Sequence, residues 1–209
     1  MALPLLNVEA IHPDLWRASQ LGSAHGRTVT SGHEAPDAEL PGHGWPTGAL
    51  TEVVVPQPGC GELRLLKAAL EAVATRPVFI LQPPHRLQPA AFTWWGAGAE
   101  NIRLLMAATT TDSLWAAEQI LRAGTAGALL FWQQQLRPET LRRLHLSAQH
   151  ADTLLFLFRP KATANSTPPA PLRISIDAAP DGVNVSFIKR RGPHREKPVS
   201  RSSWGPSLR

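Results

Sequence analysis

Cysteine is almost absent from the chain, since Cys60 is the only one among 209 residues. A single cysteine excludes an internal disulfide and fits a reducing cytoplasm. Long apolar runs are also missing, because none approaches the ~18 residues of a membrane-spanning helix. The N-terminus lacks a charged segment followed by a long apolar stretch, so we expect no signal peptide. Together these absences predict a cytoplasmic protein that does not enter a membrane.

Grouped metal ligands are missing as well. His25, His33 and His43 lie in a segment rich in glycine and proline. Zinc sites have tighter spacing than these histidines, and no cysteine or carboxylate is grouped with them. The sequence therefore predicts no metal and no cofactor.

Most of the chain carries no excess charge of either sign. Residues 1–189 contain fifteen Lys/Arg and fifteen Asp/Glu, whereas residues 190–209 contain six Lys/Arg and one Glu. A balanced body argues against a large DNA-binding face, although a local patch stays open. The candidate patch lies on a predicted helix and consists of Arg137, Arg142, Arg143 and His145.

The central feature that is present is a strand, a turn and a helix. Residues 49–55 are apolar and β-branched, which is typical of a buried strand. Residues 56–61 are rich in proline and glycine, so the chain turns there. Apolar residues then recur at helical spacing from Leu63 to Val73. This order resembles a phosphate loop, in which backbone N–H groups cradle an anion.

The chemistry of a working phosphate loop is missing from this segment. Such a loop needs Lys and then Ser or Thr after its last glycine, but Gly61 is followed by Glu62 and Leu63. A carboxylate at this position would repel phosphate. We therefore interpret Gly59, Gly61, Glu62 and Leu63 as a degenerate phosphate loop. Cys60 is either a thiol whose pKa is lowered by the following helix or a plain turn residue.

Two further positions, where an ATPase with a phosphate loop would carry acidic residues, also lack carboxylates. The strand predicted at 78–82 ends at Gln82 and is followed by Pro83 and Pro84, and the acidic residue that would orient water is missing from positions 82–84. The strand predicted at 128–132 ends at Trp132, where an Asp would hold Mg²⁺. Three independent losses predict a protein that is not an enzyme.

Strands and helices alternate along residues 49–158, which predicts an α/β fold with a mainly parallel central sheet. Strands at 172–176 and 183–187 then alternate apolar and polar residues around a turn at 179–182. They predict a C-terminal antiparallel hairpin at one edge of the sheet. Trp94 and Trp95 are either core residues or part of a partner-binding surface.

The segment before the loop carries a family resemblance. Thr30-Ser31-Gly32 and the glycine-rich run 42–48 resemble the entry to the RecA phosphate loop. More narrowly, the chain resembles the ImuA family in the sequences HPDLWRA, TVTSGHEAPDAELPGHGWPTGALTE and WAAEQILRAG. The resemblance covers nearly all of residues 1–200. It implies a RecA-like three-layer core over residues 27–189 and a bridge between RecA and ImuB, a catalytically inactive Y-family polymerase homologue.

The two ends of the chain are the predicted partner-binding regions. Residues 1–26 contain a short helix beginning near Pro13, and Leu15 and Trp16 would contact a RecA-fold neighbour or their own core. Residues 190–209 have the composition of a disordered basic tail. Its candidate partner-binding residues are Trp204, Arg190, Arg191, Arg195 and Lys197.

Three functions remain open from the sequence. The first is a non-catalytic adaptor in SOS-induced translesion DNA synthesis, as the ImuA resemblance implies. The others are a SulA-like division inhibitor that binds FtsZ and a weak RecA-like ATPase. Self-association and direct DNA binding are not decided by the sequence.

Overall fold

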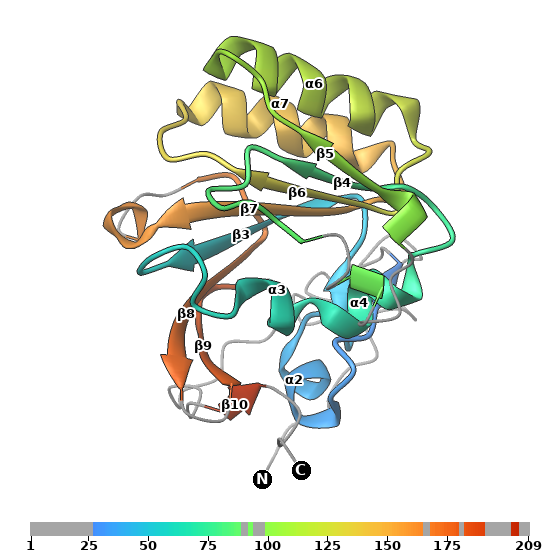
Figure 1. Cartoon of the computed structure of the whole chain (residues 1–209). Coiled ribbons are helices and arrows are strands. Elements are labelled where there is room, and N and C mark those ends of the chain that lie inside the picture. The colour runs from blue at the N-terminus through green and yellow to red at the C-terminus, as the bar shows by residue number, and fades with distance from the viewer. Residues whose placement is uncertain are drawn as a thin grey trace, which may run out of the picture.

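An eight-stranded sheet forms the centre of the molecule (Figure 1). The computed structural model describes residues 27–88, 92–93, 99–164, 168–179, 182–190 and 202–204. The strands lie in the order β10-β9-β8-β3-β7-β6-β4-β5. Their bounds are β3 (Ala49–Val55), β4 (Val78–Leu81), β5 (Ile102–Leu105), β6 (Ala128–Trp132), β7 (Leu154–Pro160), β8 (Leu172–Ala179), β9 (Gly182–Lys189) and β10 (Ser202–Trp204).

The sheet is parallel except at one edge. Strands β8, β3, β7, β6, β4 and β5 pair in parallel, while β9 is antiparallel to β8 and to β10. The central strands are apolar on both faces, as expected of parallel strands covered on both sides. A separate two-stranded sheet consists of β1 (Thr28–Val29) and β2 (Trp45–Pro46).

Helices cover both faces of the sheet, so the core has three layers (Figure 1). Helices α6 (Thr110–Ala123) and α7 (Pro138–Gln149) lie on one face. Helices α3 (Glu62–Leu65) and α4 (Lys67–Ala72) lie on the other, near α2 (Glu34–Glu39). Two short 3-10 helices, η2 (Ala99–Asn101) and η3 (Lys161–Thr163), complete the described elements.

Each face of the sheet has its own hydrophobic core. Val53 and Phe156 face α3 and α4, where Leu66 and Leu70 pack against them. Residues of the same strands with the opposite parity, such as Leu50, face α6 and α7. This arrangement confirms the predicted fold class, an α/β RecA-like three-layer core with a mainly parallel sheet and a C-terminal antiparallel hairpin.

The C-terminal segment differs from its prediction at three residues. Ser202–Trp204 form strand β10, which pairs with Val183–Val185 of β9, so these residues are not disordered. Without β10, strand β9 would present unpaired N–H and C=O groups at the edge of the sheet, and pairing satisfies them. Composition gave no signal of this pairing because it is made by backbone groups.

Helices in the described part of the chain are all too short or too polar to cross a membrane. The predicted positions Leu15, Trp16, Trp94, Trp95, Arg191, Arg195 and Lys197 lie outside the described residues.

Candidate functional site

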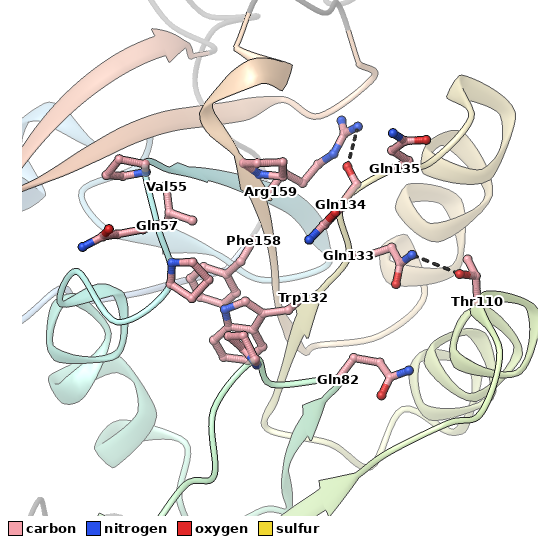
Figure 2. Close-up of a pocket in the computed structure, with 14 residues that line it drawn as sticks. Val55, Gln57, Gln82, Thr110, Trp132, Gln133, Gln134, Gln135, Phe158 and Arg159 are labelled. Carbon is pink, nitrogen blue, oxygen red and sulfur yellow. Dashed lines mark hydrogen bonds between the residues drawn. The ribbon is translucent and has the colours of Figure 1, made fainter.

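A cavity of about 620 Å³ lies at the carboxyl ends of β3, β4, β6 and β7 (Figure 2). Ligands of open α/β sheets bind in the crevice at these strand ends. We call it the strand-end cavity. It is lined by residues 55–58, Gln82, Pro84, Thr110, residues 132–135 and residues 158–160.

The degenerate phosphate loop borders this cavity and connects β3 to α3. Gly59 and Gly61 have φ angles of 85° and 109°, in the left-handed region that favours glycine. A Cβ added at Gly61 would come within 2.7 Å of a Val183 methyl group, so glycine is also required sterically. The loop therefore has a concave backbone whose N–H groups converge, as phosphate-binding loops do.

The side chain of Glu62 fills this concave loop. Its Oε1 accepts a hydrogen bond from the Gly59 N–H at 2.8 Å, and its Oε2 accepts one from the Gly61 N–H at 3.2 Å. Glu62 is only 4% exposed. The sequence predicted that this carboxylate would repel phosphate. In the structure, the carboxylate also accepts hydrogen bonds from the backbone N–H groups that a phosphate would use.

The next position, Leu63, completes the change in chemistry. Leu63 is partly buried and packs against the core on the α3 side of the sheet. A hydroxyl that could bind Mg²⁺ is replaced there by an apolar contact. Gly59, Gly61, Glu62 and Leu63 thus form a loop in which the Glu62 carboxylate occupies the amides of the two glycines.

Cys60 in the same loop does not have the lowered pKa that its position allowed. Burial raises the pKa of the Cys60 thiol to about 11, and the neighbouring Glu62 carboxylate adds to the shift. Of the two alternatives that the sequence left open, the lowered pKa is excluded, because burial and then the Glu62 carboxylate disfavour the thiolate. At neutral pH this cysteine is a buried thiol rather than a nucleophile.

Trp132 occupies the end of β6, where the sequence placed a lost magnesium ligand. Its indole stacks on Phe158 of the neighbouring strand β7, with ring centroids 4.3 Å apart and an interplanar angle of 16°. The side chain is 7% exposed. A stacked pair of aromatic rings therefore occupies the position at which phosphoryl transfer would need a metal-binding carboxylate.

Gln82, the first residue after β4, has a local structural role. Its Oε1 accepts a hydrogen bond from the Ala107 N–H, and its Nε2 donates to the Ala107 carbonyl oxygen at 2.8 Å. The backbone φ of Gln82 is 54°, which is uncommon for a residue other than glycine. This amide fastens the end of β4 to the chain after β5.

A buried ionic triad behind the strand-end cavity was not predicted. Glu52 on β3 accepts hydrogen bonds from Arg159 Nη1 on β7 at 3.1 Å and from Arg173 Nε on β8 at 2.7 Å. Glu52 has no exposed surface, and the side chains of Arg159 and Arg173 are 6% and 3% exposed. One carboxylate between two guanidinium groups leaves a net charge of +1. The one sign of this triad in the sequence was Glu52 itself, because a carboxylate within a mostly apolar strand needs a charged partner when it is buried.

Arg159 connects this triad to the cavity. Its Nη2 donates to the Gln134 carbonyl oxygen, and Gln133 donates from Nε2 to Thr110 Oγ1 (Figure 2). Among the described residues that line the cavity, Arg159 is the only one with a charged side chain. The cavity is thus mostly neutral, with a buried positive group at its wall.

One predicted partner-binding residue, Arg190, contacts another part of its own chain. Arg190 donates from Nη1 to the Glu39 carbonyl oxygen at 2.7 Å and to Glu39 Oε2 at 3.1 Å, which fixes the end of β9 to α2. Arg190 therefore makes a structural contact within this chain, and its role in partner binding stays a prediction. Trp204 lies in β10, opposite Val183.

The candidate basic patch on α7 is also reduced. Arg143 forms an ion pair with Glu118 of α6 at 2.7 Å, and the same carboxylate lies 3.6 Å from Arg122. His145 Nδ1 accepts a hydrogen bond from the Leu50 N–H, so this ring contacts the sheet. Arg137, Arg142 and Arg143 are exposed, but the charge of Arg143 is paired with Glu118, which leaves a smaller patch than the sequence indicated.

Groups of three or more potential metal ligands do not occur among the described residues. No protein-family model matches the chain, and no curated protein matches it.

Proposed function

We propose that this protein is a non-catalytic RecA-like adaptor in SOS-induced translesion DNA synthesis, where it bridges RecA and an ImuB-type partner. The observation that best supports a non-catalytic role is the contact between Glu62 and the loop amides of Gly59 and Gly61. A nucleotide would have to displace a buried carboxylate before its phosphates could reach these donors.

The other catalytic positions support the same reading. Phosphoryl transfer depends on positioned cations and a metal-binding carboxylate. Here Leu63 packs into the core, Trp132 stacks on Phe158, and Gln82 is bonded to Ala107. None of these three side chains can hold Mg²⁺ with an ionised oxygen.

The choice of pathway rests on the resemblance of residues 12–18, 28–52 and 115–124 to the ImuA family. In this proposal the fold supplies a rigid body, and the segments 1–26 and 191–209 supply the contacts with partners. Arg190 is left out of the partner surface because Glu39 already binds it.

Immobilised full-length protein should be tested against purified RecA, ImuB and FtsZ by biolayer interferometry. The adaptor proposal expects binding to RecA and to ImuB. Deletion of residues 191–209 should weaken ImuB binding, whereas Trp16→Ala should weaken RecA binding. Circular dichroism of both variants checks that the body remains folded.

Two results would overturn the proposal. Binding to FtsZ without binding to RecA or ImuB would support the SulA-like alternative. Mg²⁺-dependent ATP hydrolysis that disappears when Trp132 is changed to Ala would support the ATPase alternative. Unchanged ImuB affinity after deletion of residues 191–209 would remove the role of the C-terminal segment.

A further inference from the structure

The polar groups that a ligand can reach in the strand-end cavity are mostly glutamine amides. Gln57 follows β3, Gln134 and Gln135 follow β6, and all three residues are exposed. Within the described part of the chain, their side-chain amides have no hydrogen-bond partner. Strand β7 lies between β3 and β6 in the sheet, so Gln57 and Gln134 flank its end from opposite sides (Figure 2). A ligand that crosses the end of β7 would therefore meet an amide on each side.

The cavity offers no accessible charge. Arg159 is the only charged residue among the described residues that line it, and it is 6% exposed. Its guanidinium group is already bonded to Glu52 and to the Gln134 carbonyl oxygen. A charged group that entered the cavity would lose its water without meeting an accessible counterion. The part of a ligand that lies in the cavity should therefore be uncharged.

Nucleic acid lacks the contacts that it needs in this cavity. Single strands bind where basic side chains follow the phosphates and bases stack on aromatic faces. The rings of Trp132 and Phe158 stack on each other, and the two residues are only 7% and 2% exposed. With Arg159 buried, neither the bases nor the phosphates of a nucleic acid find a matching surface.

The accessible walls of the cavity are otherwise rigid and apolar. Pro56, Pro58 and Pro84 are exposed at the rim, and proline loses little side-chain entropy when a ligand covers it. Small-molecule sites enclose most of their ligand, whereas this cavity of about 620 Å³ has an exposed rim and leaves room for a longer chain. A peptide group has one donor and one acceptor that a glutamine amide can match.

We propose that the strand-end cavity docks an uncharged, extended segment of a protein partner, whose backbone pairs with the side-chain amides of Gln57 and Gln134. The inference goes beyond the adaptor proposal, which assigns the partner contacts to the two ends of the chain. It does not depend on that proposal, because its evidence is the chemistry of the cavity in the body of the protein.

A peptide library tests this inference on the full-length protein. Random short peptides displayed on phage are selected on the immobilised protein, and the enriched peptides are synthesised with a fluorescein label. Fluorescence polarisation then measures their Kd. We expect enriched peptides with a shared uncharged core and a Kd on the order of 10–100 µM. The proposal is overturned if no peptide is enriched above a surface coated with albumin.

A matched pair of double variants tests the two amides. Gln57→Ala combined with Gln134→Ala removes both, so peptide affinity should fall about tenfold. Gln88→Ala combined with Gln119→Ala removes two exposed amides that do not line the cavity, and should leave affinity unchanged. All four residues are exposed, so circular dichroism should show the same fold in both variants. Equal peptide affinity in the two double variants overturns the proposal.

The charge of the occupant is tested on the peptide. A Glu or a Lys in place of one residue of the shared core should each weaken binding about tenfold. Unchanged affinity for either charged peptide contradicts an uncharged occupant. Labelled oligo(dT) is titrated in the same way. Binding of oligo(dT) that is lost in the Gln57 and Gln134 double variant would assign the cavity to nucleic acid instead.

Discussion

The degenerate phosphate loop and the strand-end cavity are adjacent, and the residues of both include buried hydrogen-bond donors, yet only the donors of the loop are satisfied from within the chain. In the loop, the Glu62 carboxylate accepts from Gly59 and Gly61. In the cavity, Trp132 Nε1 and Arg159 Nε have no acceptor among the described residues. The loop keeps the glycine conformations of a phosphate loop. It is blocked because the Glu62 carboxylate occupies its amide donors.

The two regions also use their buried glutamates differently. Glu62 bonds to neutral backbone amides within three residues of itself, so its contacts are local. Glu52 bonds to two arginines on neighbouring strands that lie far away in the sequence. Four tests, two of them on variants of these glutamates, can contradict or refine this comparison.

The largest expected effect is that of Glu52→Ala on stability. Removal of the shared carboxylate breaks the buried ion pairs with Arg159 and Arg173, and breaking a buried ion pair costs about 3–5 kcal/mol. Urea unfolding measures the free energy of unfolding. Glu71→Ala is the control, because Glu71 and Lys67 form an exposed pair worth under about 1 kcal/mol. Similar losses in the two variants would show that the triad does not support the wall of the cavity.

The next effect is that of Glu62→Ala on the loop. Two backbone N–H groups lose a charged acceptor, so the free energy of unfolding should fall by about 3 kcal/mol. Glu62→Gln keeps one oxygen acceptor and should lose less. A drop as large in Glu62→Gln as in Glu62→Ala would mean that charge, rather than hydrogen bonding, closes the loop.

A third test uses the reactivity of Cys60. Because burial raises the pKa of this thiol to about 11, little thiolate exists at pH 8.5, and iodoacetamide should react about 100-fold more slowly than in the unfolded chain. The raised pKa contributes stability that is present below the unfolded pKa and is lost as pH rises through about 11. Alkylation followed by mass spectrometry gives the rate. Equal rates in the folded and urea-unfolded protein would place Cys60 at the surface.

Glu62→Gln should increase Cys60 alkylation, since the variant removes the negative charge beside the thiol.

The smallest expected effect is that of nucleotide on the wild-type protein. A ligand that binds only the folded state raises its melting temperature in proportion to ln(1 + [L]/Kd). Because Glu62 fills the loop, millimolar Mg²⁺-ATP should leave the melting temperature unchanged. Differential scanning fluorimetry measures the shift, with Mg²⁺ alone as the control. A Mg²⁺-dependent rise in melting temperature with ATP would show that Glu62 does not keep nucleotide out of the loop.

Local patterns predicted most of the regular structure. The strand at Ala49–Val55 and the strand at Ala128–Trp132 were expected at the bounds that the structure has. The helix after β5 begins earlier than expected, because Thr109 Oγ1 accepts from the Asp112 N–H and caps it. Five consecutive residues there, from Thr109 to Ser113, are of types that can cap a helix, so the sequence alone could not select Thr109.

The continuous helix expected after the loop was not found as such. The chain forms α3 and then α4, with Leu66 between them in a tighter turn where its N–H donates to the Leu63 carbonyl oxygen. Apolar spacing from Leu63 to Leu70 is nearly the same in one helix or in two short ones. Periodicity therefore predicted the buried face but not the break.

The sequence by itself determined the order of strands and helices, the glycines of the loop, and the absence of lysine, hydroxyl and carboxylate at the catalytic positions. These follow from local periodicity, turn residues and side-chain chemistry. Only the tertiary structure decided which donors are satisfied. Glu52 meets Arg159 and Arg173 across 107 and 121 sequence positions. Trp132 and Phe158 face each other because β6 and β7 pair. Such contacts depend on strand order and register. Local sequence patterns do not specify the order or the register, because both are fixed by the packing of the whole sheet.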